Sequence, residues 1–268
     1  MRVFVTGHKG YIGSELIKRG FHALECDVTN PLEIERAIKY AKPQLVLHLA
    51  GKSGVNWCQK KENQEQVIRT NVRGTYNIFE SLRQFRIPGV LLSTDQIWRG
   101  RIFESHRENS KNTPPVNFYA MSKVAAESVA RSFNVNIVRT SYLFNSIRLE
   151  DHLYNTEIGN PVHYPVFIRR SFMHLGDFCD ALERYCGNFY KMPKTLHLSG
   201  SEIVSWYGFM KEVAKFYGRK GVVRPRFREI ESGAPRPWFG GLNTSLSQSL
   251  GFLPLSYKDG IERMRSEG

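Results

Sequence analysis

The stretch RVFVTGHKGYIGSEL, residues 2–16, decides the fold. Its first part, Arg2–Val5, is a run of β-branched and aromatic residues that predicts a buried strand. Ile12–Arg19 then has apolar residues at helical spacing, so three glycines lie where a strand gives way to a helix. Such glycines let backbone N–H groups approach a dinucleotide pyrophosphate, but a strand, turn and helix without a ligand has the same pattern. The spacing GxxGxxG alone leaves both interpretations open.

The composition limits the class of protein. With 268 residues, 41% hydrophobic and 24% charged, the chain suits one large α/β domain or a nucleotide domain with a small second one. No apolar run has the length of a membrane span and Met1 leads directly into the first strand, so we expect a cytoplasmic protein without membrane contact. The cysteines have neither CxxC spacing nor a histidine at metal-ligand spacing, which predicts buried thiols: Cys26, Cys58, Cys179 and Cys186.

The formal net charge of +13 has two interpretations. Clustered Lys and Arg would favour nucleic-acid binding, because they neutralise phosphates. The basic residues are scattered, however, with only short groups such as Arg224, Arg226 and Arg228, and no nucleic-acid-binding motif accompanies them. A basic surface that attracts nucleotides and nucleotide sugars explains the charge equally well, and we expect no nucleic-acid partner.

Apolar runs alternate with helical patterns through the first half of the chain, without hairpin motifs. Strands are expected at Phe21–Glu25, Gln44–Ala50, Gly89–Ser93, Asn134–Thr140 and Thr195–Ser199, and helices at Pro31–Ala41, Asn71–Phe85, Ala120–Phe133, Asp177–Tyr185 and Trp206–Phe216. Asn145–Arg170 is expected to be loop. The order predicts an α/β fold with a Rossmann-like, doubly wound parallel sheet. We expect an NAD(P)-binding domain over residues 1–144 and a small substrate-binding lobe over residues 145–268, parts of which return to the main domain.

The stretch FYAMSKVAAES places Tyr119 and Lys123 four residues apart at the start of a helix, hence on one face. An ammonium beside a phenol stabilises the phenolate, which lowers the pKa of the tyrosine and suits it for general acid catalysis. A surface Tyr–Lys pair is the alternative. Upstream, Thr94 follows a predicted strand, where its hydroxyl could hydrogen-bond the same carbonyl oxygen.

These motifs in this order resemble the extended short-chain dehydrogenase/reductase superfamily, and within it the dTDP-4-dehydrorhamnose reductases. The resemblance covers nearly the whole chain and rests on the glycine loop, CDVTNP (residues 26–31), NVRGTYN (71–77), LLSTDQIW (91–98), VNFYAMSK (116–123), IVRTSYLF (137–144), LHLSGSEIVSWYGF (196–209) and APRPWFGGLNTSLSQSLGF (234–252). It implies an oxidoreductase of nucleotide-sugar metabolism, of the kind found in dTDP-rhamnose biosynthesis.

The resemblance also implies residue roles. Thr94, Tyr119 and Lys123 are the expected catalytic residues: Thr94 polarises the carbonyl, Tyr119 protonates its oxygen, and Lys123 binds the nicotinamide ribose. The expected cofactor contacts are Gly7, Lys9, Gly10, Tyr11, Ile12, Gly13, Asp27, Val28, Ala50, Gly51, Lys52, Tyr119 and Lys123. The expected substrate contacts are Thr94, Asp95, Tyr142 and Arg236, with a solvated surface arginine as the alternative for Arg236. Asn71 is either a structural or proton-relay asparagine or a plain helix N-cap.

The chain departs from the family at three places. The segment between the first helix and CDVTNP is short, so no acidic residue is securely placed on the ribose 2′-hydroxyl, and Lys9 favours NADP(H), with NAD(H) as the second option. VNWCQKKENQ (residues 55–64) stands where the family often has an acidic cluster, so we expect no metal. The chain is also short for the family, so its sugar and base stay open, as does the possibility of a homodimer.

Three functions remain open. The first is an NAD(P)H-dependent reductase of a nucleotide-linked 4-keto-6-deoxysugar. The second is a non-catalytic, cofactor-binding regulatory subunit, because the methionine adenosyltransferase beta subunit resembles the same subgroup. The third is a nucleotide-sugar epimerase or dehydratase of the same fold. Thr94 is followed by Asp95 and Gln96, whereas dehydratases of the superfamily have Asp then Glu, so we expect no dehydratase activity.

Overall fold

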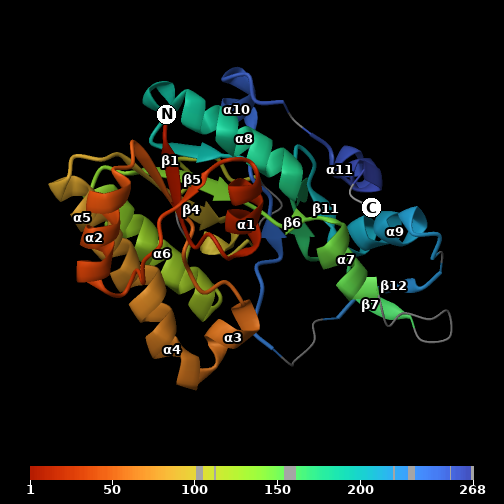
Figure 1. The fold of residues 1–268 in the computed structure, drawn as a ribbon. Helices are drawn as coiled ribbons and strands as arrows, with labels where there is room; N and C mark the ends of the chain where they lie inside the picture. The colour runs from red at the N-terminus through yellow and green to blue at the C-terminus, as the bar shows by residue number, and fades with distance from the viewer. Residues whose placement is uncertain are drawn as a thin grey trace.

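A parallel sheet with helices on both faces forms the body of the molecule (Figure 1). The computed structural model describes residues 1–100, 105–111, 113–153, 161–219, 221–228, 233–253 and 255–266. The strands of this sheet are β1 (Val3–Thr6), β2 (His22–Ala23), β3 (Leu45–His48), β4 (Gly89–Thr94), β5 (Asn136–Thr140) and β10 (Thr195–His197). They lie in the order β10-β5-β4-β3-β1-β2, and every neighbouring pair is parallel. The predicted doubly wound sheet is confirmed.

The strand order places a topological switch point between β1 and β3. From β1 the chain moves outward to β2, then returns across the sheet to β3 and continues to β4 and β5. The loops after β1 and β3 therefore diverge to opposite faces and leave a crevice at the carboxyl ends of the strands, where ligands bind in folds of this kind. The glycine loop follows β1 directly at this crevice.

Alternate side chains of the strands feed two separate cores, because successive residues of a strand point to opposite faces. On one face, Val5 and Leu47 pack with α1 (Tyr11–Lys18) and α8 (Leu175–Gly187). On the other face, Val46 packs with residues of three helices, namely α2 (Pro31–Ala41), α5 (Gly74–Gln84) and α6 (Phe118–Ser132). Figure 1 shows α1 and α8 on one side of the sheet and α2, α5 and α6 on the other.

The connection from β3 to α5 is helical, which the sequence analysis did not predict upstream of Asn71. It contains α3 (Val55–Gln59), α4 (Lys61–Ile68) and a π-helical segment (Arg69–Arg73) that leads into α5 without a break. Such π-helical segments within helices are frequently found at functional sites. Asn71 lies inside this segment and is buried, so its interpretation as a helix N-cap is wrong.

The residues after β5 build a second core beside the sheet and also return to the sheet through α8 and β10. Aromatic residues dominate this second core, including Phe144, Phe172 and Phe209. Its elements and the remaining short ones are β6 (Leu143–Phe144), α7 (Ser146–Leu153), β7 (Val162–Pro165), β8 (Arg169–Arg170), β9 (Met173–His174), β11 (Val204–Ser205), α9 (Trp206–Phe216), β12 (Val223–Arg226), β13 (Phe239–Gly240), α10 (Ser245–Ser249) and α11 (Tyr257–Arg263), with 3₁₀ turns at Asp95–Ile97, Phe189–Lys191 and Met264–Ser266.

Two expectations about local structure are wrong. The range Asn145–Arg170 contains α7, β7 and β8 rather than loop alone. β7 pairs in parallel with β12, and β8 pairs with β11 and β13, so these strands are fixed by partners that are distant in sequence. Cys26 is only half-buried, because the strand before it ends after His22–Ala23 and leaves it near the edge of the sheet; the other three thiols are buried as expected.

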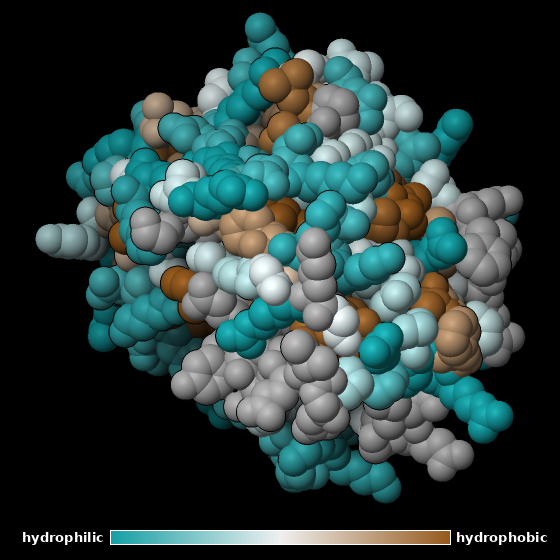
Figure 2. All heavy atoms as spheres, turned by 90° about the vertical axis from the view of Figure 1, so that its right-hand side faces the viewer, coloured by the Kyte–Doolittle hydropathy of each residue, from teal (hydrophilic) through white to brown (hydrophobic). Residues whose placement is uncertain are grey.

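The surface of the face that carries α7, α9 and β12 is mainly hydrophilic. Figure 2 shows hydrophobic residues there as small separate patches between hydrophilic ones. Among the described helices, none is long and apolar enough to cross a membrane.

Candidate active site

A cavity of about 280 Å³ opens at the carboxyl ends of β1, β3, β4 and β5. Its walls come from the glycine loop, the ends of these strands, the start of α6 and one residue of α7. The lining residues are Gly7, Gly10, Tyr11, Ile12, Gly13, Leu49, Gly51, Lys52, Ser53, Leu92, Ser93, Thr94, Asp95, Gln96, Tyr119, Lys123, Thr140, Ser141, Tyr142, Leu143, Arg148 and Arg170. All three expected catalytic residues therefore share one cavity with the glycine loop.

The glycine loop is so closely packed that side chains are excluded from it. A Cβ on Gly13 would lie 2.3 Å from the carbonyl oxygen of Gly7 and 2.7 Å from the Cα of His8. Gly7 has a φ of +69°, which favours glycine, and a Cβ there would lie 2.8 Å from the backbone of Ala50. The backbone thus stays open at the start of α1, which is the geometry that a dinucleotide pyrophosphate requires. The residues present fit such a cofactor.

Four of the expected cofactor residues do not line this cavity. Lys9 is exposed on the glycine loop, and Ala50 follows β3 with its backbone N–H donating to Thr6 Oγ1 over 3.2 Å. Asp27 is exposed, and the backbone N–H of Thr29 donates to its carboxylate and lowers its pKa. The side chain of Val28 is buried in the core beside Gly74. Only the backbone of Val28 is thus left to face a ligand.

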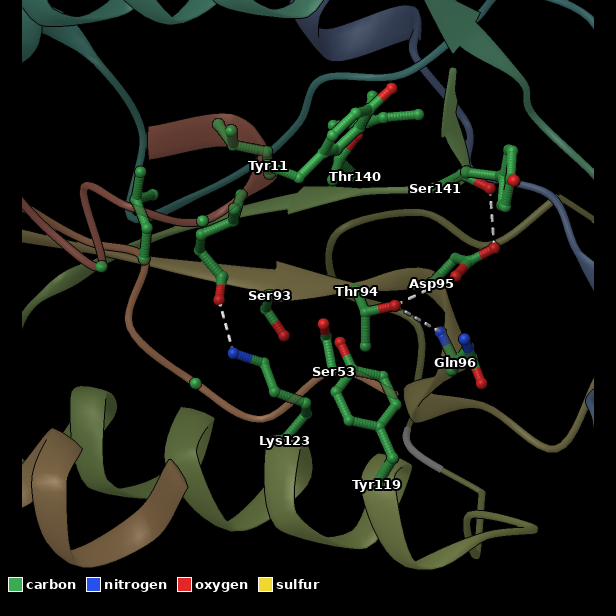
Figure 3. A pocket seen from close by; sticks show the side chains of 18 of the residues that line it. Tyr11, Ser53, Ser93, Thr94, Asp95, Gln96, Tyr119, Lys123, Thr140 and Ser141 are labelled. Carbon is green, nitrogen blue, oxygen red and sulfur yellow. Dashed lines mark hydrogen bonds between the residues drawn. The ribbon is translucent and has the colours of Figure 1, made fainter. Parts of the chain in front are cut away.

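The polar side chains of the site converge from β4 and α6. In Figure 3, Tyr119 and Lys123 rise from α6 toward Ser93 and Thr94 at the end of β4. Tyr119 and Thr94 both line the cavity, and the side chain of Thr94 is near enough to the phenol to lower its pKa. Thr94 Oγ1 also accepts from the backbone N–H of Gln96 at 3.3 Å, and so caps the 3₁₀ turn that follows. The sequence spacing thus brings two hydroxyl groups to one point.

The electrostatics of the Tyr119–Lys123 pair differ from the expectation. Burial raises the pKa of the Tyr119 phenol well above its usual value, and the nearby side chain of Thr94 offsets only part of this effect. The ammonium of Lys123 donates to the carbonyl oxygen of Leu92 over 2.6 Å, and burial lowers its pKa to about 8. The phenol is therefore held protonated, and Lys123 is bound to the backbone of β4 rather than to the tyrosine.

Asp95 lines the cavity, but other protein groups engage its carboxylate. Ser141 donates to it over 2.7 Å and Thr94 over 3.1 Å, and the guanidinium of Arg170 lies 3.3 Å away. Burial raises the pKa of Asp95, although Arg170 and the two hydroxyls act in the opposite direction. A Cβ on Gly240 would come within 2.5 Å of this carboxylate, so β13 closes the site from the side of the second core.

The side chain of Asn71 connects the loop after β3 to the first turn of α6. Its side chain accepts from the backbone N–H of Lys52 over 2.7 Å and donates to the carbonyl oxygen of Lys52 and to Ser122 Oγ. The Ser122 hydroxyl donates to the carbonyl oxygen of Tyr119 over 2.7 Å. The loop after β3 and the first turn of α6 are thereby held in fixed positions.

Arg236 does not line this cavity. It lines a neighbouring one of about 410 Å³ together with Arg99, Pro114, Pro115, Val116, Pro235 and Trp238. Its guanidinium donates to Asn56 Oδ1 over 3.0 Å, and its burial lowers its pKa, so it is not a fully solvated surface arginine. The two cavities are adjacent, because the amide of Asn117 donates both to Gln96, in the first cavity, and to the carbonyl oxygen of Pro235, in the second.

The sequence analysis missed two charged residues of the cavity, Arg148 and Arg170. Both lie in the range that was expected to be loop. Arg148 belongs to α7 and Arg170 to β8. The apolar residues on either side of Arg148, Ile147 and Leu149, are two residues apart, a spacing that does not predict a helix.

Comparison with known proteins places this site in a family. The family model of the RmlD substrate binding domain matches residues 1–155, which is more than half of the chain. The chain belongs to this family. The match contains the glycine loop, Thr94, Tyr119 and Lys123.

Individual relatives are distant but cover the whole chain. The spore coat polysaccharide biosynthesis protein SpsK of Bacillus subtilis is 21% identical over 99% of this chain and 97% of its own length. A probable dTDP-4,6-dihydroxy-2-methyloxan-3-one 4-ketoreductase of Streptomyces antibioticus is 24% identical over 95% of this chain and 91% of its own length. The solved structure of dTDP-4-dehydrorhamnose reductase from Bacillus anthracis in complex with NADP has a TM-score of 0.89 and 22% identity, covering 100% of this chain and 99% of that one.

Proposed function

We propose that this chain is an oxidoreductase that uses NADPH to reduce the 4-keto group of a nucleotide-linked 6-deoxyhexose. The observation that carries the proposal is that Tyr119, Thr94 and Lys123 line the same cavity as the glycine loop. The NADP-bound reductase of the same fold supports the cofactor, and the 4-ketoreductase relative supports the class of substrate. NADH is the second cofactor option, because the solved UDP-glucose 4-epimerase of Thermus thermophilus, of similar fold, contains NAD.

Tyr119 is proposed to be the proton donor. Burial keeps its phenol protonated at neutral pH, so the proton is in place when a carbonyl oxygen binds. When bound, the cofactor supplies a hydride for the carbonyl carbon. The oxygen then carries the developing negative charge of an alkoxide, which is a far stronger base than a phenolate and takes the proton from Tyr119. Water entering the cavity reprotonates the phenolate after product release.

Thr94 and Lys123 are proposed to position the reacting groups. The Thr94 hydroxyl, which donates to Asp95 in this structure, is proposed to turn and donate a second hydrogen bond to the same carbonyl oxygen. The ammonium of Lys123 is proposed to leave the carbonyl oxygen of Leu92 for the hydroxyls of the cofactor ribose. Residues 145–268 are proposed to hold the substrate together with Tyr142. Tyr142 lines the main cavity, and Arg236 lines the adjacent one.

The test uses Tyr119→Phe, which removes only the hydroxyl. We expect kcat on dTDP-4-keto-6-deoxyhexose to fall by about 10²–10⁴-fold, because a positioned general acid is worth that much. The dissociation constant of NADPH, measured by fluorescence, should change little. Tyr190→Phe, at a tyrosine that is 82% exposed, is the matched control and should leave both quantities unchanged.

Two results would contradict the proposal. Turnover of Tyr119→Phe at the wild-type rate would remove the tyrosine from the reaction. A wild-type protein that binds NADPH but reduces no keto sugar, whether linked to dTDP, UDP or GDP, would instead favour a cofactor-binding regulatory subunit.

A further inference from the structure

The guanidinium of Arg148 packs against two tyrosine rings in the wall of the cavity. Its central carbon lies 4.8 Å from the ring centroid of Tyr11 and 4.7 Å from that of Tyr142. One of its N–H groups donates to the carbonyl oxygen of Leu143 over 3.3 Å. The residue is half-buried and lines the cavity. Its position is therefore fixed by two aromatic contacts and one hydrogen bond.

The two rings come from opposite halves of the site. Tyr11 opens α1 directly after the glycine loop, whereas Tyr142 follows β5, and Arg148 itself belongs to α7. The Tyr11 hydroxyl donates to Asn145 Oδ1 over 2.9 Å, and the same oxygen accepts from the backbone N–H of Arg148. The first turn of α7 is thus fastened to the glycine loop. Arg148 stands at the junction between the glycine loop and the residues proposed to hold the substrate.

The charges of two other cavity cations, Arg170 and Lys123, are compensated in a way that the charge of Arg148 is not, whereas Lys52, like Arg148, lies over an aromatic ring, that of Trp57. Arg170 forms an ion pair with Asp95 over 3.3 Å. Lys123 is bound to the carbonyl oxygen of Leu92 and lies within the electrostatic influence of Glu127. Among the carboxylates whose side chains the structure describes, none forms an ion pair with Arg148. Neutral aromatic rings hold this cation in the site instead.

The stacked arrangement suits the binding of a phosphate. A guanidinium presents its N–H donors in its own plane, in a fork that matches two phosphate oxygens. The two ring contacts and the hydrogen bond to Leu143 restrict the orientation of this plane, and a guanidinium has five N–H donors, so donors remain for a ligand. Because the side chain is already ordered, little rotamer freedom is lost when a ligand binds. The arrangement is thus prepared for an anion that enters the cavity.

We propose that Arg148 is a positioning residue that binds the diphosphate of a nucleotide ligand in this cavity. The identity of the ligands rests on the proposed function. Two ligands contain such a group. One is the cofactor, whose pyrophosphate would approach Arg148 from the side of Tyr11, and the other is the nucleotide sugar, whose diphosphate would approach from the side of Tyr142. The alternative is that Arg148 has only a structural role and holds α7 against the glycine loop.

The experiment measures binding rather than turnover. Arg148→Met keeps an unbranched apolar stem between the rings and removes the charge and the donors, and Arg148→Lys restores the charge without the planar fork. NADPH, dTDP and thymidine are titrated onto wild type and variants by fluorescence or calorimetry. Arg184→Met is the matched control, because the guanidinium of Arg184 is stacked 5.4 Å from the ring centroid of Phe252 outside the cavity.

We expect Arg148→Met to raise the dissociation constant of NADPH or of dTDP by about tenfold or more, with partial recovery in Arg148→Lys. A change for NADPH alone assigns the cofactor pyrophosphate, and a change for dTDP alone assigns the substrate diphosphate. Thymidine has no phosphate, so its binding should not change. The proposal is overturned if both nucleotides bind Arg148→Met within about twofold of wild type, or if thymidine weakens as much as dTDP. A shift in nucleotide binding without any keto-sugar reduction by wild type would uphold Arg148 and refute the reductase.

Discussion

Replacing Lys123 by methionine should stabilise the ligand-free protein while it damages the site. Burial lowers the pKa of the ammonium from 10.5 to about 8. That difference corresponds to about 3.4 kcal/mol of unfavourable free energy for the charged form at neutral pH. Methionine has a stem of similar length but leaves the carbonyl oxygen of Leu92 without its donor, at a cost of about 1–3 kcal/mol. We therefore expect Lys123→Met to raise the free energy of unfolding by about 1–2 kcal/mol at pH 7.

The pKa shift of Lys123 determines how its contribution to stability changes with pH. The pKa of Lys123 is lower in the folded state than in the unfolded state, so between pH 8 and pH 10.5 the unfolded state binds more protons. The contribution of Lys123 to stability therefore rises with pH across this window, and the full penalty applies below pH 8. The advantage of Lys123→Met over wild type should shrink by about 2 kcal/mol between pH 7 and pH 9.5.

Urea unfolding of both proteins at pH 7 and pH 9.5 measures this difference, and comparing the two cancels the titration of other groups. Lys18→Met, at a lysine whose side chain is 74% exposed, is the control and should shift stability by less than about 0.5 kcal/mol at either pH. A Lys123→Met protein that is less stable at pH 7, or whose difference from wild type does not depend on pH, would refute the reasoning. NADPH binding should weaken in the same variant, because a proposed ribose ligand is lost.

Three further outcomes are expected. NADPH should be preferred over NADH in kcat/KM, and Lys9→Ala should reduce this preference by about tenfold, since an exposed cation on the glycine loop can meet a 2′-phosphate; an NADH preference or an unchanged ratio in the variant counts against this. Gly13→Ala should abolish NADPH binding and destabilise the fold by more than about 2 kcal/mol, because its Cβ would lie 2.3 Å from the carbonyl oxygen of Gly7. The control is Gly187→Ala, whose Cβ would have nothing within 4 Å and which should change neither stability nor NADPH binding. Incubation with dTDP-glucose and NAD should give no 4-keto-6-deoxy product, because the amide of Gln96, which accepts from Asn117, cannot remove a proton; detection of that product by mass spectrometry would show the prediction to be wrong.

The sheet could be predicted from the sequence because its strands carry their own pattern. Leu45–His48 and Asn136–Thr140 are buried throughout, the first contains the apolar run Leu45–Leu47 and the second the β-branched pair Ile137 and Val138, and the helices between them have clear apolar faces. The lobe lacks such local patterns. Val162–Pro165 is a strand because it pairs with Val223–Arg226, about sixty residues later in the chain, and neither segment alternates in a way that reveals this.

The site was predictable to the extent that strand ends and helical spacing determine it. Thr94 follows a buried strand and Tyr119 lies one helical turn before Lys123, so their convergence follows from the chain itself. The partners of Asp95 could not be predicted from the sequence in this way. Arg170 reaches it from a two-residue strand whose neighbours are β11 and β13, and this contact depends on the packing of the second core.

The electrostatics of the cavity connect these observations. Four cations line it, namely Lys52, Lys123, Arg148 and Arg170, and the one described carboxylate among the lining residues, Asp95, is already engaged by Arg170. Cations that share a cavity repel one another and so disfavour the folded state. A ligand with several negative charges offsets this repulsion when it binds. We therefore expect a phosphorylated ligand to stabilise the folded protein. The sequence shows a surplus of positive charge, but only the fold shows that part of it is concentrated where α1, β4, α6 and α7 meet.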